Sequence, residues 1–221
     1  NNAEQLLQQR QAQISRSGPI SGYGLRSSMH SEYRALAYAD MDIDRAECQQ
    51  VIASLRSTIQ VPTLRLNTLF TMPPAQREDW QEHLNRLPAQ IAGPWSQLAQ
   101  RSGPVPQPNR DLANWSMQLT YALHQAGVPI GAGTDTPIGL SIPGYSLHTE
   151  LERLVQTGLT PMDAIHSATI RPAQFMRLQE TYGQIQPGYI ADLLLLSADP
   201  TEDIRNTRSI STVISKGAIV R

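Results

Sequence analysis

Residues 128–137, with the sequence VPIGAGTDTP, constrain the fold of this chain more than any other stretch. A short apolar run rich in glycine ends in one carboxylate, Asp135, and Pro137 follows two positions later. This pattern predicts a buried strand over residues 128–134 whose last side chain emerges at its C-terminal end. Alternatively, Asp135 only begins the next turn, a position that acids commonly occupy.

Helical spacing of apolar residues is present on both sides of this segment. Residues 109–126 predict a helix that Gly127 ends as a C-cap, and the strand carrying Asp135 follows directly. A second helix is predicted over residues 148–157, and Thr160 caps a third, in which a proline holds the first helical position. Helices and strands therefore alternate in this half of the chain.

Residues 58–64 predict another strand, which Pro62 ends. Short connections between alternating elements favour parallel crossovers, so we expect strands 58–64 and 128–134 to be parallel and adjacent. Asp135 would then lie at their C-terminal edge, where barrels of alternating strands and helices carry their chemistry. An acid in that place can bind a metal ion or accept a proton from a metal-bound water.

The flanking regions give weaker signals. Asp44 starts a predicted helix with a capping-box pattern, and its apolar face contains Cys48, which we expect to be a buried structural thiol. Between residues 66 and 108, a helix is predicted after Pro73-Pro74, and a proline-rich linker follows at 103–108. A connection of this length over a strand end is often a substrate lid, and it can equally be an inert insertion.

The C-terminal residues predict a small β unit. Residues 191–196 form a predicted strand, and residues 212–215 pair with 218–220 as a hairpin around Lys216-Gly217. We expect these strands to make an antiparallel patch that is separate from the parallel pair.

Composition narrows the partners and the compartment. The net charge is −1, from 18 basic and 19 acidic residues, which argues against a nucleic-acid or anionic-membrane partner. No apolar run approaches the roughly 20 residues that span a bilayer. Cys48 is the one cysteine, so an internal disulfide and a cysteine-based metal cluster are both excluded. The first residues lack a signal-peptide pattern, which fits a cytoplasmic protein and also an exported one whose signal has been removed.

Four stretches carry a family resemblance. They are GTD at 133–135, LHTEL at 147–151, AIHSAT at 164–169, and the run from YGQI to ADL at 182–193. At this spacing they resemble the C-terminal part of the metal-dependent amidohydrolase superfamily, in the branch of imidazolonepropionase and prolidase-like dipeptide hydrolases. A weaker resemblance runs back through residues 61–64, which are similar to the family's seventh barrel strand.

The resemblance implies an α/β fold, namely the C-terminal portion of a (β/α)8 TIM-type barrel plus part of a small β-sandwich. Residues 1–57 would be an insertion-like helical region, residues 58–180 the last two or three βα units, and residues 181–221 the sandwich strands. It also implies hydrolysis of an amide or cyclic amide C–N bond in a small-molecule or dipeptide-like substrate. Water activated by a divalent metal would attack that bond, and zinc is the expected metal.

The resemblance also assigns residues to the site. Asp135 matches the carboxylate at the end of strand eight, which binds the metal and accepts the proton of the attacking water. His148 and Glu150 match a motif beyond that strand, which in the family lies near the site and shapes the adjoining loop. We expect His148, Thr134 and Tyr145 to contact the substrate.

The chain departs from the family pattern in its metal ligands. Members carry a His-x-His pair on strand one, a lysine or acid on strand four, and single histidines on strands five and six. This chain has no His-x-His, and its one lysine, Lys216, lies in the terminal hairpin. His30 is a candidate for the strand-six ligand, although no apolar strand precedes it. The histidines in helical patterns, His83, His124 and His166, are expected to be surface or packing residues.

Two hypotheses follow from these departures. The chain is either the C-terminal fragment of a longer hydrolase, which the absence of an initiator methionine favours, or a catalytically inactive half-barrel that binds a partner or self-associates. One carboxylate makes a weak metal site, so we expect this chain alone to bind zinc weakly or not at all. Unpaired strand edges drive association, so we expect a homo-oligomer or association with the missing N-terminal half.

Overall fold

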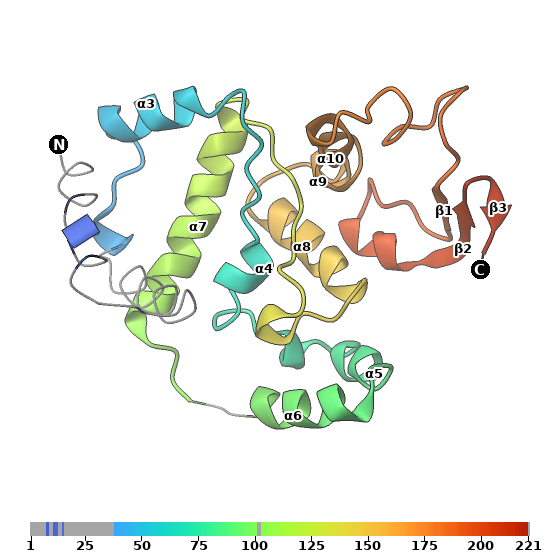
Figure 1. Ribbon diagram of the computed structural model, residues 1–221. Helices are drawn as coiled ribbons and strands as arrows, with labels where there is room; N and C mark the ends of the chain where they lie inside the picture. The colour runs from blue at the N-terminus through green and yellow to red at the C-terminus, as the bar shows by residue number, and fades with distance from the viewer. Residues whose placement is uncertain (1–7, 9–10, 13–14, 16–37, 101–102, 221) are drawn as a thin grey trace.

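The computed structural model describes residues 38–100 and 103–220, together with residues 8, 11, 12 and 15. Helices make up most of the regular structure in these residues (Figure 1). In chain order the elements are η1 (Tyr38–Asp40), α3 (Ala46–Ser54), α4 (Leu64–Asn67), η2 (Pro74–Gln76), α5 (Trp80–Leu84), α6 (Ala89–Ala99), α7 (Gln107–Gln125), η3 (Ile138–Leu140), α8 (Tyr145–Gln156), α9 (Pro161–Ala168), α10 (Ile170–Phe175), β1 (Leu193–Leu196), η4 (Ile204–Arg208), β2 (Ile210–Ser215) and β3 (Ala218–Ile219), where η marks a 3-10 helix.

Two extended segments that are far apart in the sequence lie side by side near the centre of the molecule (Figure 1). Gln60 and Ile130 form an isolated parallel bridge. The N–H of Gln60 donates to the carbonyl of Pro129 at 2.9 Å, and the N–H of Gly131 donates to the carbonyl of Gln60 at 2.9 Å. The predicted parallel pairing is confirmed, but the expected strand lengths are wrong, because the ladder between these segments consists of this one bridge.

Proline explains why the ladder is so short. In this register the next backbone donors toward the two ends of the ladder would belong to Pro62 and Pro129. Proline has no backbone N–H, so neither hydrogen bond can form. The two prolines therefore limit the pairing to the residues between them.

A first apolar core joins these segments to the surrounding helices. Helix α4, which follows directly on the first segment, lies against both α7 and α8. The end of that segment is therefore enclosed between two helices. The buried members of this core are Ile52, Leu64, Leu123, Val128, Ile130, Leu151, Leu154, Leu159, Ala164 and Ile204.

A second apolar core lies where α5 and α6 meet the loop that follows Asp135, in the lower part of Figure 1. Its buried members are Trp80, Leu84, Leu140, Ile142 and Tyr145. The region that the sequence presents as a lid or an inert insertion thus packs against residues shortly after Asp135. Both interpretations of this region stay predictions.

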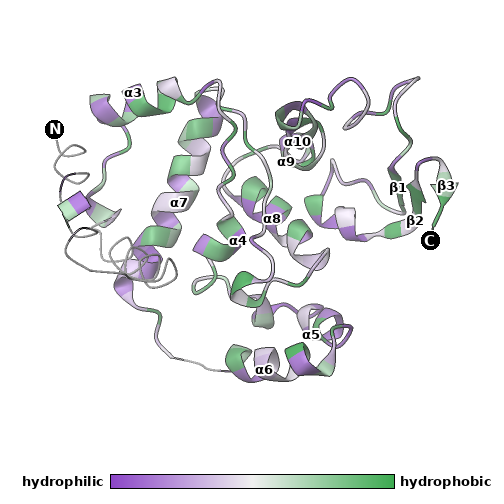
Figure 2. Cartoon of the chain, viewed as in Figure 1, coloured by the Kyte–Doolittle hydropathy of each residue, from purple (hydrophilic) through white to green (hydrophobic). Residues whose placement is uncertain are grey.

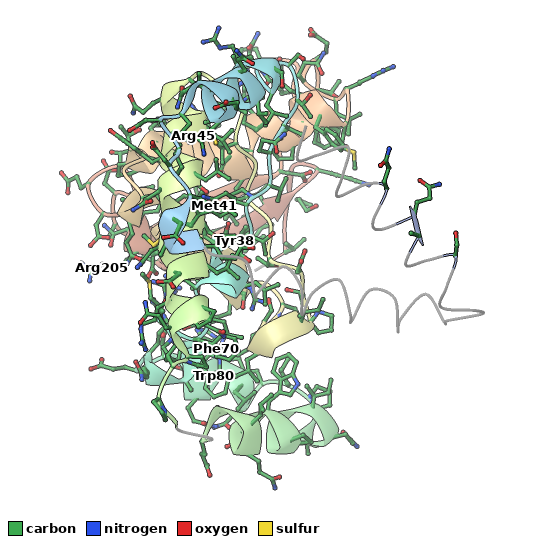
Figure 3. All side chains as sticks on the ribbon, turned by 90° about the vertical axis from the view of Figure 1, so that its left-hand side faces the viewer. Tyr38, Met41, Arg45, Phe70, Trp80 and Arg205 are labelled. Carbon is green, nitrogen blue, oxygen red and sulfur yellow. The ribbon has the colours of Figure 1, made fainter. Side chains whose placement is uncertain are left out.

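The predicted helix over residues 109–126 is confirmed as α7, and Gly127, with a φ of 78°, ends it. Short helix η1 packs against α7, and the ring centroid of Tyr38 lies 5.1 Å from that of Trp115. Figure 3 shows Tyr38 lying over this helix. Although α7 has 19 residues, neither it nor another helix in the described ranges has the length and hydropathy needed to cross a bilayer.

Helix α3 corrects two expectations. The capping box predicted at Asp44 does not form, because α3 begins at Ala46 and its N-cap, Arg45, makes no side-chain cap hydrogen bond. Cys48 is exposed, so the prediction of a buried thiol is wrong. The residue of α3 that reaches the core is Ile52. An apolar stripe shows which residues share a helix face, but not how much of that face a neighbouring element covers.

The helices after Asp135 begin close to where they are predicted. Thr160 caps α9 in a complete capping box, in which the N–H of Asp163 donates to the Thr160 hydroxyl at 3.1 Å. Helix α8 starts at Tyr145, three residues before the predicted start at residue 148. This earlier start places Tyr145 in the first turn of α8, directly after the loop that carries Asp135.

The C-terminal strands form the predicted antiparallel patch, a three-stranded sheet in the order β1-β2-β3. The hairpin between β2 and β3 is confirmed, and both Lys216 and Gly217 have the positive φ that tight hairpin turns require. Figure 2 shows hydrophobic residues along β1 and β3. Whether this sheet is part of a sandwich, and whether the chain divides at residues 57 and 180, stays a prediction.

A substitution at Gly133 tests the side-by-side arrangement of the two segments. A Cβ built on Gly133 would lie 2.4 Å from Cγ1 of Val61. Gly133→Ala should therefore destabilise the chain by about 1–3 kcal/mol, as overpacking does. In a Val61→Ala background the same change should cost much less, because the colliding methyl group is gone. Chemical denaturation of the four variants measures this coupling.

Gly103→Ala is the matched control, because a Cβ at Gly103 meets nothing within 4 Å. It should leave the free energy of unfolding nearly unchanged. An equal cost of Gly133→Ala in both backgrounds would show that residues 61 and 133 are not in contact, which contradicts the pairing.

Candidate functional site

Asp135 stands at the C-terminal end of the second paired segment, and it is exposed. Its backbone has a φ of 48°, in the left-handed region that aspartate tolerates better than most residues. Its carbonyl accepts the N–H of Ile138 at 2.7 Å, which closes a turn into η3. The two positions that the sequence suggests for Asp135 are therefore compatible, because Asp135 ends the segment and also begins a turn.

Thr134 lies directly before this carboxylate, as the sequence requires. Its hydroxyl oxygen is 2.8 Å from that of Thr136, which is in turn 2.6 Å from the hydroxyl oxygen of Ser141. Ser141 is fully buried, so this chain of hydroxyls ties the Asp135 turn to the interior. The predicted contact of Thr134 with a substrate stays a prediction.

Thr63 is the counterpart of Asp135 on the first segment. It also has a φ of 48°, and it immediately precedes α4. A β-branched residue is unusual in the left-handed region, and such a conformation costs on the order of 1–3 kcal/mol. It persists where the surrounding contacts hold it in place.

Glu150, on α8, supplies contacts of this kind directly after Thr63. Its carboxylate is fully buried, and its two oxygens accept the backbone N–H of Leu64 at 2.9 Å and that of Arg65 at 2.7 Å. Burial raises the pKa of Glu150 to about 7, against the two backbone donors and the charge of Arg65, which lower it. These two hydrogen bonds thus attach the first turn of α4 to α8.

Arg65 extends this contact to the second segment. Its Nη1 donates to the carbonyl of Gly139 at 3.1 Å and its Nη2 to that of Ile138 at 2.5 Å. Burial lowers the pKa of Arg65, and the negative charges of Glu150 and Asp135 oppose that shift. One side chain therefore links the ends of both segments.

Tyr145 is buried in the first turn of α8, beside the Asp135 loop, because its ring belongs to the second core. Its hydroxyl donates to Asp79 at 2.8 Å and accepts from Nε of Arg77 at 2.9 Å. Burial and the bond to Asp79 raise the pKa of Tyr145 to about 12, so the phenol is neutral near pH 7. Both hydrogen-bond partners of its hydroxyl lie in the segment before α5. The predicted contact of Tyr145 with a substrate stays a prediction.

His148 faces the C-terminal β unit. Its Nδ1 lies 2.9 Å from the hydroxyl oxygen of Thr207 in η4. Burial and the positive charge of Arg208 lower the pKa of His148 to about 4, so the ring is neutral near pH 7. The structure thus pairs His148 with η4 and not with the Asp135 loop, and its substrate contact also stays a prediction.

A cluster of four charged side chains joins α8 to its neighbours. Glu152 is almost fully buried and accepts hydrogen bonds from Arg77, at 2.6 and 3.1 Å, and from Arg208. Asp79 completes the cluster, 3.5 Å from Nε of Arg77 and 3.4 Å from Nε of Arg208. Burial lowers the pKa of Arg77, but the hydrogen bond and charge of Glu152 outweigh it, so the pKa lies above its ordinary value. Two positive and two negative charges thus compensate one another.

No local sequence pattern indicates the members of this cluster, which are Arg77, Asp79, Glu152 and Arg208. They come from three regions that only the tertiary structure brings together. Glu150 and Glu152 flank the apolar Leu151 in the predicted helix, but neighbouring helix positions face different directions, so this pattern does not indicate that either acid is buried.

Two histidines of the helical patterns lie in packing or surface pairs, and the third, His166, is exposed. The ring of His83 is centred 4.5 Å from the ring of Tyr145. His124 lies 3.8 Å from the carboxylate of Asp163. These placements agree with the predicted packing and surface roles, while His30 lies outside the described residues.

The residues that the structure describes do not complete a metal centre. Within them, no group of three or more His, Cys, Asp or Glu side chains could hold a metal ion. Asp135 offers the kind of oxygen that zinc binds, but a catalytic zinc takes three protein ligands. The described donors therefore do not fit a complete zinc site by themselves.

The paired segments and the acid at their carboxyl end define an α/β protein with a polar strand end. Comparison with known proteins agrees. The family model described as the Amidohydrolase family matches residues 58–220, well over half of the chain. The chain therefore belongs to the amidohydrolase family.

Individual relatives match over part of their length. Ochratoxinase from Aspergillus niger is 39% identical over 96 residues, which are 42% of this chain and 19% of the relative. Imidazolonepropionase from Salmonella typhi is 36% identical over 83 residues, 37% of this chain and 20% of the relative. A solved Xaa-Pro dipeptidase with bound methionine in the active site matches with a TM-score of 0.55 and 21% identity, over 80% of this chain and 37% of that one.

These comparisons confirm the family resemblance and the α/β fold class. The structural similarity implies a TIM-barrel-like arrangement. The matched stretch spans about a fifth of the length of the curated relatives. The activity of a complete protein is therefore a matter for proposal.

Glu152 should be critical for stability, because it neutralises two largely buried arginines. Glu152→Gln keeps the shape but removes the charge, and breaking a buried ion pair costs about 3 kcal/mol or more. Denaturant titration near pH 7 measures this loss.

Glu82→Gln is the control, because Glu82 forms an exposed i,i+4 pair with Arg86. Exposed pairs contribute about 0.5 kcal/mol or less. Equal, small effects of the two substitutions would contradict a stabilising role for the cluster.

Proposed function

We propose that this chain provides the C-terminal barrel units of a metal-dependent amidohydrolase, which hydrolyses a C–N bond in a small-molecule or dipeptide-like substrate. The observation that carries the proposal is the parallel bridge between Gln60 and Ile130, which sets Asp135 at the carboxyl end of two neighbouring segments. That edge is where barrels of this type carry their chemistry. The family match over residues 58–220 supports the same class of reaction.

Asp135 is the proposed general base. It is exposed, so water and a substrate can reach it. A carboxylate in this position can take the proton of the attacking water as the C–N bond is hydrolysed. The same carboxylate is the one metal ligand that we assign to this chain.

Zinc is the metal that we propose for the complete enzyme, and its other ligands lie outside the described residues. The relatives extend well beyond the matched region, since this chain covers 37% of the dipeptidase. The partner that we propose is therefore the remaining part of a barrel, which would supply those ligands. The alternative of a catalytically inactive half-barrel is not favoured, because the family model matches residues 58–220 throughout.

Replacing Asp135 tests the proposed mechanism. In the protein expressed from its complete open reading frame, Asp135→Asn should lower kcat by about 10²–10⁴-fold, because the amide keeps the shape but cannot accept a proton. Hydrolysis can be followed with zinc present on a panel of N-acyl amino acids, Xaa-Pro dipeptides and cyclic amides.

The control is Asp111→Asn, which removes a partly exposed carboxylate on α7 that accepts a hydrogen bond from Gln107, and it should leave turnover unchanged. Full activity of Asp135→Asn would remove the assignment of the base. Elemental analysis of the 221-residue chain adds a further check. About one zinc per chain, lost on Asp135→Ala, would show that the remaining ligands lie within these residues, with His30 and His148 the first to examine.

We also propose that the 221-residue chain associates. Val61 beside the bridge and Leu194 and Ile219 in the β unit are each more than half exposed. Exposed strand edges with apolar side chains favour association. Light scattering should report at least a dimer, and a single species of 24.4 kDa would contradict this expectation.

A further inference from the structure

The turn that carries Asp135 is connected to the rest of the molecule through Arg65. The N–H of Ile138 donates to the carbonyl of Asp135 at 2.7 Å, and the carbonyl of the same Ile138 accepts Nη2 of Arg65 at 2.5 Å. Nη1 of Arg65 also donates to the neighbouring carbonyl of Gly139 at 3.1 Å. Ile138 is thus held on one side by Asp135 and on the other by Arg65.

Arg65 is itself held in a fixed position. Its backbone N–H donates to the fully buried carboxylate of Glu150, which also accepts the N–H of Leu64. These hydrogen bonds anchor the backbone of Arg65. Because the residue is only 5% exposed, its side chain has little freedom to move. The guanidinium is planar and presents its donors in a fixed fork, which suits two neighbouring carbonyls.

Charges of opposite sign alternate along this connection, in the order Glu150, Arg65, Asp135. Burial lowers the pKa of Arg65, and one buried carboxylate, Glu150, and one exposed carboxylate, Asp135, oppose that shift. Two left-handed residues, Thr63 and Asp135, occupy the two ends of this connection. Such conformations need surrounding contacts to persist, and Glu150 and Arg65 provide them at both ends.

Space around the turn is limited as well. A Cβ built on Gly139 would lie 2.8 Å from Leu66 and 3.4 Å from Nη2 of Arg65. The backbone of η3 therefore sits close against α4, and the arginine reaches its carbonyls over a short distance. A mere space-filling role for Arg65 would not require both hydrogen bonds to this one loop.

We propose that Arg65 is a positioning residue, which together with Glu150 fixes the Asp135 turn relative to the end of the neighbouring segment. This inference rests on the proposed function in assigning the reactive carboxylate to Asp135. The geometry that it concerns is independent of any activity. It can therefore be tested on the 221-residue chain.

Hydrogen exchange measured by mass spectrometry gives the direct test. Arg65→Met keeps the length and the apolar part of the side chain but removes the donors. We expect amide exchange in residues 136–142 to become about tenfold faster or more, because hydrogen bonds from a charged donor are lost. Exchange in α7 should stay unchanged. Arg65→Lys, which keeps the charge but cannot span two carbonyls, should give an intermediate effect.

Arg56→Met is the matched control. Nε of Arg56 also donates to a backbone carbonyl, that of Ala126, at 2.9 Å. That contact lies before the second segment and not after it, so exchange in residues 136–142 should not change. If Arg65→Met prevents folding, the Arg65→Lys chain carries the comparison. Unchanged exchange in the loop, or a uniform acceleration that includes α7, would overturn the proposal.

Kinetics separate this proposal from the proposed function. In an active preparation, Arg65→Lys should lower kcat with little change in KM, because it disturbs the placement of the base and not the binding of substrate. A faster-exchanging loop in a protein without hydrolytic activity would support the positioning role and count against the proposed function. A normal loop with normal kcat in Arg65→Lys would reject the positioning role and leave the proposed function intact.

Discussion

The buried carboxylate of Glu150 is the constraint on which the arrangement around Asp135 depends. Removing a carboxylate from water is costly, and here two backbone N–H groups and the nearby charge of Arg65 offset that cost. Because these donors belong to the first turn of α4, the carboxylate fixes where the first segment ends. Leu64, in the same turn, is fully buried in the first core, so packing and hydrogen bonding locate this point together.

Two contacts connect the end of the first segment to the second segment. The parallel bridge at Gln60 and Ile130 aligns the segments, and Arg65 connects their ends. The bridge contributes few hydrogen bonds, because prolines block its extension in both directions. Side-chain hydrogen bonds at the segment ends therefore supply part of the alignment that a longer backbone ladder would supply.

The charged cluster around Glu152 connects α8 to regions outside the two paired segments. It joins α8 to the segment before α5 through Arg77 and to η4 through Arg208. The C-terminal β unit and the helices at the lower side of Figure 1 are thus attached to the same helix that carries Glu150. Since α8 also follows the Asp135 loop, its first three turns connect the candidate site to both neighbouring regions.

Local patterns in the sequence were sufficient for much of the framework. Thr160 and the proline after it predicted the start of α9, Gly127 predicted the end of α7, and Lys216-Gly217 predicted the final hairpin, because each of these signals acts over a few residues. The run that ends in Asp135 likewise indicated a segment end with an exposed acid. The same local reasoning failed for Cys48, since exposure depends on which elements cover α3.

What the sequence by itself determined is therefore the family, the order of elements and the acid at a segment end, all of which are encoded in short stretches of residues. Only the tertiary structure decided that one bridge replaces two full strands, and that Arg65 rather than Tyr145 or His148 connects to the Asp135 turn. It also decided that Glu152 meets Arg77 and Arg208. The physical reason is that a buried charge is stable only beside its partners, and those partners come from distant parts of the chain, where no local periodicity can indicate them.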